Sequence, residues 1–271
     1  MTFDPDVFGS DRVYPDGSFM FQCHLFGYRD LASRLQPGVR VLDLACGDGY
    51  GSAVVAARGC ETVGLDLDGA LLAQSAGKYR AARFVAASAL RLPFAESTFD
   101  AVGALQVIEH LVETQELLRE IARVLRPGGL LYVTTPNIAQ LPATASKEFN
   151  PHHLRDFTPG ELETELRAVF GEVQLYGQML DESLPRARSL LTAAEAEWRV
   201  IDRVAAVERL VRGLPGPVRV RLRKVLLRLS GVPRWPLPEA EAARGAITAE
   251  DFRTAAPAEA SGNTIAVARK S

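Results

Sequence analysis

The sequence has few cysteines, few histidines and no long apolar run. Its three cysteines, Cys23, Cys46 and Cys60, are odd in number and lack Cys-x-x-Cys spacing, which argues against a disulfide framework and against a zinc site. No basic segment precedes an apolar run near residue 1, and no apolar stretch is long enough to span a bilayer. These absences favour a protein of the reducing cytoplasm, without a signal peptide or membrane helix.

The chain also lacks an excess of charge of one sign. Its 271 residues include 31 basic and 33 acidic side chains, and this balance does not favour a nucleic-acid partner. Apolar residues make up 47% of the sequence, which suffices for one large core and a smaller appended element.

A strand followed by a glycine-rich turn and a helix, residues 39–52, is the most distinctive stretch. Glycine reaches positive φ and lets a ligand lie against the backbone, so a small polar ligand is expected here. The dinucleotide-binding pattern would need glycine where Ser52 stands, and the Gly-Lys-Ser/Thr of a Walker A loop is absent. An acidic residue followed by small residues at alternate positions fits instead: Asp43, Ala45, Gly47, Gly49 and Gly51.

Strand and helix signals alternate through most of the chain. The expected strands are 39–44, 62–65, 83–87, 99–105, 130–135, 173–176 and 264–269. The expected helices are 21–35, 52–58, 69–78, 113–125 and 159–170, with Asp68 and Thr158 as N-caps. This order predicts an α/β fold with an open parallel sheet covered on both faces. Ligands of such sheets bind beyond the carboxyl ends of the strands, where the glycine turn lies.

The turn and the segments after it resemble the motifs of class I S-adenosylmethionine (SAM)-dependent methyltransferases. The matching segments are Gly-Leu-Asp at 64–66, Leu-Pro-Phe at 92–94, Gln-Val-Ile-Glu-His-Leu at 106–111 and the Pro-Gly-Gly turn at 127–129. The resemblance covers about residues 38–138 closely. It implies a Rossmann-like, seven-stranded, doubly wound sheet, closed by an antiparallel edge hairpin after a helical insertion, with SAM as cofactor.

The same resemblance implies roles for the cofactor-site residues. Asp66 is expected to accept hydrogen bonds from the ribose hydroxyls, and Asp43 to face the SAM ammonium or the turn. Gln106 is expected near the methionine part of the cofactor. Around the adenine we expect apolar walls and backbone contacts from Leu67, Ser88, Ala89 and Leu90.

Histidine is the natural base for an alcohol acceptor, which must lose a proton when its oxygen is methylated. The Asn-Pro-His-His run at 150–153 is similar to an Asn-Pro-Phe-His segment in a subgroup associated with sugar and polysaccharide pathways. It implies His153 as base or acceptor ligand, with His152 in place of an aromatic residue. His110 either takes part in catalysis or braces its turn.

The N-terminal arm also resembles that subgroup and implies a lid over the SAM pocket. Its expected contribution is a set of pocket walls, Tyr14, His24 and Tyr28. Glu109 and Asn137 are the remaining expected contacts to the acceptor.

Four regions follow: residues 1–37 as arm and helix, 38–177 as the SAM-binding core, 178–257 as a helical insertion, and 258–271 as a final edge strand. Residues 186–234 within the insertion hold twelve basic and four acidic side chains. A basic amphipathic helix at 218–229 would fit an anionic membrane, an anionic acceptor or a solvated cap.

The predicted function is SAM-dependent methyl transfer to a hydroxyl of a sugar, glycan or glycosylated natural product. N-methylation of an amino sugar, methylation of a lipid-like acceptor, and SAM binding without catalysis are the alternatives. SAM chemistry needs no metal; Mg²⁺ could still orient an acceptor, but the spacing of Asp156, Asp181 and Glu182 defines no site. The oligomeric state is left open.

Overall fold

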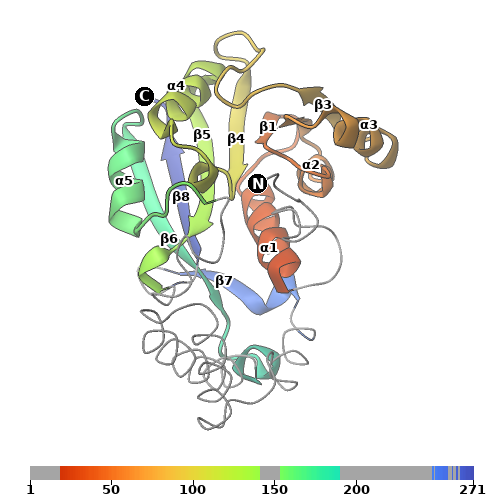
Figure 1. The fold of residues 1–271 in the computed structure, drawn as a ribbon. Coiled ribbons are helices and arrows are strands. Elements are labelled where there is room, and N and C mark those ends of the chain that lie inside the picture. The colour runs from red at the N-terminus through yellow and green to blue at the C-terminus, as the bar shows by residue number, and fades with distance from the viewer. Residues whose placement is uncertain are drawn as a thin grey trace, which may run out of the picture. The chain divides into compact units, whose positions relative to one another are not determined.

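The computed structural model describes residues 19–140, 153–189, 246, 248–255, 258, 261 and 263–271 (Figure 1). The helices are α1 (Phe19–Ser33), α2 (Tyr50–Ala56), α3 (Gly69–Lys78), α4 (Thr114–Val124) and α5 (Pro159–Arg167), with short 3-10 turns η1 (Ile108–His110), η2 (Ile138–Gln140) and η3 (Ala249–Asp251). The strands are β1 (Arg40–Leu44), β2 (Glu61–Asp66), β3 (Arg83–Ala86), β4 (Phe99–Leu105), β5 (Leu125–Pro136), β6 (Glu172–Leu180), β7 (Phe252–Ala255) and β8 (Asn263–Arg269).

Within these described residues, eight strands form one sheet in the order β3-β2-β1-β4-β5-β8-β6-β7. The first five strands are parallel to their neighbours, and β8 is antiparallel to both β5 and β6. The predicted α/β class and doubly wound sheet are confirmed. Each strand and helix predicted within the described residues is present, with boundaries that differ by a few residues.

Two details of the predicted sheet are wrong. The last strand, expected at the edge, lies between β5 and β6 and bonds to both, which buries most of its residues. The edge belongs instead to an eighth strand, β7, from a stretch that we assigned to the insertion. β7 stays with the core because the buried Phe252 ring contacts Phe26 of α1, with ring centroids 5.7 Å apart.

The sheet has a hydrophobic core on each face. Neighbouring residues of a strand point to opposite faces, so Leu42 joins one core and Val41 the other. The core around Leu42 packs α4 and α5 against the sheet, and the core around Val41 packs α1 and α2 (Figure 1). Two covered faces leave the strand ends as the place where polar side chains gather.

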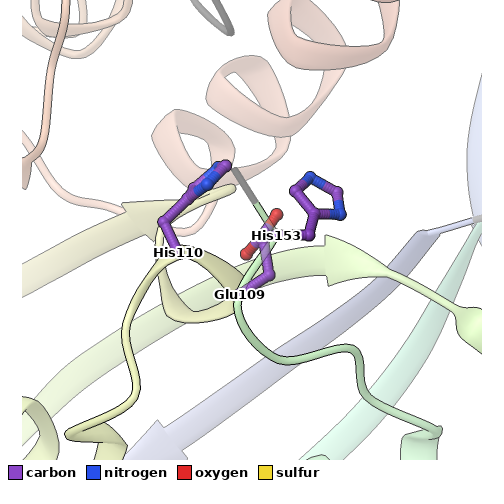
Figure 2. Close-up of side chains that lie close together, drawn as sticks. All are labelled: Glu109, His110 and His153. Carbon is purple, nitrogen blue, oxygen red and sulfur yellow. The ribbon is translucent and has the colours of Figure 1, made fainter. Parts of the chain in front are cut away.

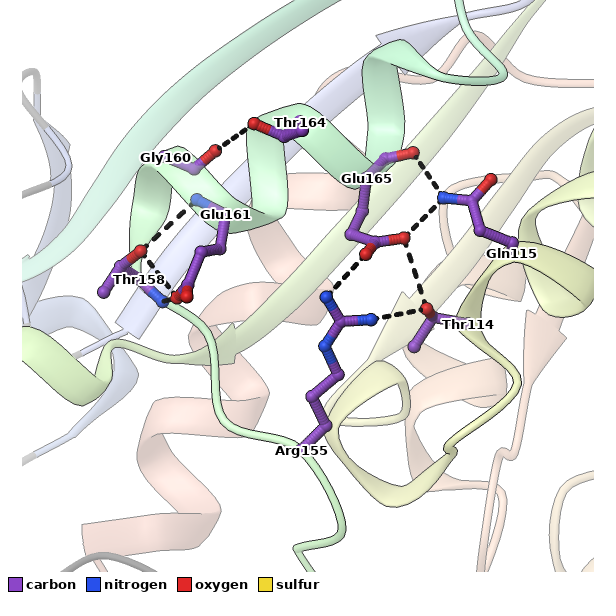
Figure 3. Close-up of polar contacts among 8 residues, drawn as sticks. All are labelled: Thr114, Gln115, Arg155, Thr158, Gly160, Glu161, Thr164 and Glu165. Atoms are coloured by element: carbon purple, nitrogen blue, oxygen red, sulfur yellow. Dashed lines mark hydrogen bonds and ion pairs between the residues drawn. The ribbon is translucent and has the colours of Figure 1, made fainter.

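The helix starts confirm the two predicted N-caps. The Asp68 carboxylate accepts from the Leu71 amide at 3.0 Å. Thr158 and Glu161 form a reciprocal capping box at the start of α5, as Figure 3 shows.

Residues 180–251 belong to a second compact unit, of which residues 180–189, 246 and 248–251 are described. Here the Arg186 guanidinium lies 3.2 Å from the buried Asp251 carboxylate, whose other oxygen accepts from Thr248. The predicted basic helix at 218–229 lies outside the described residues. In the part of the chain that is described, no helix combines the length and the apolar character needed to cross a membrane.

Gly51 gives a sharp test of the packing between α1 and α2. A Cβ at this position would lie 2.0 Å from Cζ of the Tyr28 ring, which is itself buried. We expect Gly51→Ala to lower the free energy of unfolding by about 1–3 kcal/mol, because overpacking must move the ring or the helix.

Gly77→Ala is the matched control, because Gly77 is an exposed helical glycine whose added Cβ meets nothing within 4 Å. It should raise stability by up to about 1 kcal/mol through helix propensity. Urea unfolding measures both variants. Equal effects of the two substitutions would contradict the packing argument.

Candidate active site

The carboxyl ends of β1, β2, β4 and β5 bring the predicted site residues to one edge of the sheet. Backbone strain marks this edge. Ala45 after β1 has φ of 55° and Gln106 after β4 has φ of 56°, in a region that residues other than glycine seldom occupy. Non-glycine residues held there are concentrated at functional sites, so the strain points to this edge as the site.

The glycine turn has the open surface that a ligand needs. Gly47 has φ of 53°, and a Cβ built on it would meet nothing within 4 Å. Gly49, with φ of 85°, is required for another reason, since a Cβ there would lie 2.6 Å from the Phe84 ring. Gly47 therefore leaves room for a ligand on the backbone, whereas Gly49 and Gly51 allow close packing beneath it.

Asp43 lies under this turn and is fully buried. Its carboxylate accepts from the Tyr28 hydroxyl at 3.0 Å and from the Ser52 hydroxyl at 2.6 Å. Burial raises the pKa of Asp43 to about 7, against lowering by the Ser52 and Tyr28 hydrogen bonds. Two orientations were predicted for Asp43, toward the SAM ammonium or toward the turn. The structure shows the second, with the carboxylate bonded to the Tyr28 and Ser52 hydroxyls.

Asp66 ends β2 and connects the glycine turn to α3. One carboxylate oxygen accepts from the Gly47 amide and the other from the Asp68 amide, both at 3.0 Å. The following residue, Leu67, has 76% of its surface exposed, which is unusual for a large apolar side chain. A partly buried carboxylate beside an exposed apolar side chain fits a ribose and its attached base.

The remaining predicted cofactor-site residues follow β3 and β4. The Ser88 hydroxyl accepts from the Leu90 amide at 3.2 Å, so this side chain shapes its own turn. Ala89 and Leu90 are partly buried against the core. Gln106 donates from its side chain to the Thr134 hydroxyl at 3.2 Å, which holds it at the end of β4. We expect these residues, together with Gly47 and Asp66, to contact SAM.

Two histidines from separate segments meet beyond the end of β4. The rings of His110 and His153 pack edge to face, with centroids 5.0 Å apart. Figure 2 shows the Glu109 carboxylate between them. Glu109 is buried and accepts from the Thr135 hydroxyl at 3.1 Å, while His153 Nδ1 lies 3.5 Å from Asp156. We call Glu109, His110 and His153 the histidine cluster.

Backbone hydrogen bonds hold the histidine cluster together. The Glu109 carbonyl accepts from the amides of Leu154 and Arg155, at 2.9 and 3.1 Å. Arg155 then anchors its own segment to two helices: its guanidinium lies 2.5 Å from Glu165 of α5 and donates to Thr114 of α4 at 3.0 Å (Figure 3). His153 is thus fixed relative to His110 although 42 residues separate them.

Two residues predicted for the acceptor site lie elsewhere in the structure. Tyr28 was expected to line the pocket, but it is buried beneath the turn as a donor to Asp43. Asn137 was expected to contact the acceptor, but it is fully buried and donates to the carbonyls of Ala258 and Ser261. Its role is to join the end of β5 to the chain before β8.

Three other predicted residues have different outcomes. His24 lies partly exposed on α1. Tyr14 and His152 lie outside the described residues. Gly51, expected beside the cofactor, packs on the Tyr28 ring instead.

Several residues of the site were not predicted as members of it. Ser52 was considered only as a misfit to the dinucleotide pattern, yet it supports Asp43. Asp156 was considered only as a metal candidate, and its spacing of three residues from His153 is the signal that could have indicated a partner. Arg155 gave no signal, because its partner Thr114 is 41 residues away and its partner Glu165 lies on the following helix, 10 residues away.

Comparisons with known proteins agree with this geometry. A family model described as a methyltransferase domain matches residues 42–133. A protein of Mycobacterium tuberculosis named as a probable S-adenosylmethionine-dependent methyltransferase is 31% identical over 250 residues, which span 91% of this chain and 81% of the relative. A demethylmenaquinone methyltransferase of Corynebacterium urealyticum is 39% identical over 117 residues, 42% of this chain and half of that protein.

The fold is also similar to that of solved methyltransferase structures. The structure of a SAM-dependent methyltransferase from Thermotoga maritima superposes with a TM-score of 0.56 at 15% identity, covering 93% of this chain and 92% of that one. The sheet and its glycine turn define a class I methyltransferase fold. The chain belongs to the SAM-dependent methyltransferases, and SAM is its cofactor.

Asp66→Ala should weaken SAM binding about 10–100-fold, because hydrogen bonds to a charged group contribute about 1.5–3 kcal/mol. Isothermal titration with SAM measures the change. Asp68→Ala is the matched control: it removes the cap of α3 and about 1 kcal/mol of stability, yet leaves the pocket carboxylate in place. SAM affinity that is unchanged in Asp66→Ala, or equally reduced in both variants, would contradict this assignment.

The raised pKa of Asp43 predicts a pH-dependent stability. Its stabilising contribution is complete below its ordinary value of 3.8 and is lost as pH rises through about 7. That gap corresponds to about 4 kcal/mol at most. Asp43→Asn has no proton to lose, so its stability relative to the wild type should rise between pH 5 and pH 8. Urea unfolding of both proteins without SAM checks this, and parallel pH profiles would contradict it.

Proposed function

We propose that the protein transfers a methyl group to a hydroxyl oxygen of a sugar, a glycan or a glycosylated natural product. The observation that carries the proposal is the meeting of His110 and His153 at the carboxyl edge that holds the cofactor site. A hydroxyl acceptor needs a base at this edge, and imidazole is the side chain suited to that task near neutral pH.

The chain's residues divide the work of this reaction. SAM, when bound, supplies a methyl group on a sulfonium, which is already an activated leaving group. The glycine turn and Asp66 hold the cofactor, and Gln106 borders its reactive end. His153 accepts the proton of the acceptor hydroxyl as its oxygen gains the methyl group. Asp156, 3.5 Å from Nδ1, then stabilises the imidazolium that forms.

The environment of His153 supports this role. Its side chain is 17% exposed, so it is sheltered from bulk water and still within reach of an acceptor. The Asn-Pro-His-His sequence that contains it resembles the sugar-associated subgroup. His110, packed edge to face against His153, restricts the orientation of the ring. An amino sugar presents an amine in the same geometry, so N-methylation uses the same residues.

A lipid-like acceptor is the second candidate, and two exposed apolar side chains favour it. Val112 and Leu154 are 64% and 49% exposed, and they follow His110 and His153 closely in the chain. The relatives named demethylmenaquinone methyltransferases match 36–44% of this chain, and a quinone bearing an apolar tail would use such a rim.

Contact of residues 186–234 with an anionic membrane or acceptor, and a cytoplasmic location, stay predictions.

Labelled SAM and mass spectrometry of a panel of acceptors test the proposal. The panel needs neutral sugars, oligosaccharides, a glycosylated natural product, an amino sugar and a demethylated quinone. Label on a sugar hydroxyl is expected. Label on the quinone alone would overturn the proposal in favour of the second candidate, and label on the amine alone would move it to N-methylation.

His153→Ala should reduce kcat on the identified acceptor about 100-fold or more, because a positioned base contributes about 10²–10⁴ in rate. The affinity for SAM should not change, since no cofactor-site residue is altered, and titration with SAM serves as the internal control. Turnover at the wild-type rate would refute the base assignment while leaving the methyltransferase intact.

A further inference from the structure

We infer that Glu109, His110 and His153 bind one divalent transition-metal ion. Each residue offers one donor atom, and the three donor atoms lie within 4.8 Å of one another. Figure 2 shows the carboxylate between the two imidazole rings, with the three side chains converging from two segments of the chain. Two histidines and one carboxylate on one side of an ion form a facial set, which leaves positions for water or an acceptor.

The donors are held by contacts that a metal site requires. Ligand histidines commonly direct their second nitrogen to a carboxylate, and His153 Nδ1 lies 3.5 Å from Asp156, so its Nε2 is the ligand atom. The Glu109 carboxylate is oriented by the Thr135 hydroxyl at 3.1 Å. The amides of Leu154 and Arg155, bonded to the Glu109 carbonyl, set the spacing between the histidines. These contacts of the fold therefore hold the three donor groups in position for an ion.

The donor set also selects the kind of ion. Imidazole suits zinc, iron, cobalt, nickel and copper, whereas Mg²⁺ prefers oxygen ligands and retains several waters. A buried carboxylate adds a negative charge that a cation offsets. The Mg²⁺ considered from the sequence, with Asp156, Asp181 and Glu182, does not match this arrangement. Here Asp156 contacts Nδ1 of His153 and is not itself a ligand of the ion.

This inference rests on the donor geometry and not on the proposed function. An ion bound to His153 occupies the nitrogen that would otherwise accept a proton, so the ion-bound form and the base form are alternative states of the histidine cluster. Metal binding and methyl transfer can therefore fail independently. Binding without methyl transfer would refute the proposed function alone, and methyl transfer without binding would refute the metal site alone.

Titration of the untagged full-length protein with Co²⁺, followed by calorimetry and visible absorption, tests the site. One ion per chain is expected, with Zn²⁺ competing for it and Mg²⁺ in excess leaving it in place. His110→Ala and His153→Ala should each lose most of the binding. Asp156→Asn should weaken it by about 10–100-fold, as the loss of a second-layer partner does.

His24→Ala is the matched control, since His24 lies on α1 outside the cluster, and its Co²⁺ affinity should equal that of the wild type. Glu109→Gln tests the carboxylate; should this buried substitution prevent folding, the two histidine variants still decide the question. Absence of Co²⁺ binding in the wild type would overturn the inference. Binding that survives both His110→Ala and His153→Ala would be adventitious and would overturn it equally.

Discussion

The buried carboxylate of Asp43 ties together the three elements that begin the fold. It belongs to β1, and it accepts one hydrogen bond from Tyr28 of α1 and another from Ser52 of α2. A carboxylate without such donors would be expensive to bury. The pair of bonds therefore fixes where α1 and α2 lie against the sheet. That placement makes a glycine necessary at position 51, beneath the Tyr28 ring.

The glycine turn follows from this tie. With β1 and α2 held from below, the chain between them must turn sharply, and Ala45, Gly47 and Gly49 all take positive φ to do so. Asp66 then holds the turn from the side through the Gly47 amide. The same carboxylate supports the turn and is the one that we expect to bind the ribose, so in that case cofactor binding would exchange or share this hydrogen bond.

The local arrangement of the residues assigned to the cofactor half could be predicted from the sequence more completely than that of the acceptor half, for a physical reason. Asp43, Gly47 and Asp66 lie within one strand-turn-helix-strand unit, where short spacing and parallel strands determine the geometry. The helix caps Asp68 and Thr158 are equally local. Such features can be inferred from residue type and spacing alone.

The acceptor half depends on contacts between distant segments. Asn137 carries a polar side chain at a strand end, as a ligand-binding residue does, but its partners Ala258 and Ser261 are more than 100 residues away. The antiparallel strand β8 was placed at the edge on the family resemblance, and its own seven residues carry no sign of its pairing with both neighbours. Arg155 and Glu165 show the same limit. Their ion pair positions His153, yet nothing in either residue's local sequence indicates the other.

The two halves of the site share one electrostatic character. Asp43 and Asp66 lie at the cofactor end of the carboxyl edge, and Glu109 and Asp156 at the acceptor end. Carboxylates in a sheltered site favour cations, whether a sulfonium, an imidazolium or a metal ion. At the acceptor end the same preference supports the metal ion that we infer for Glu109, His110 and His153.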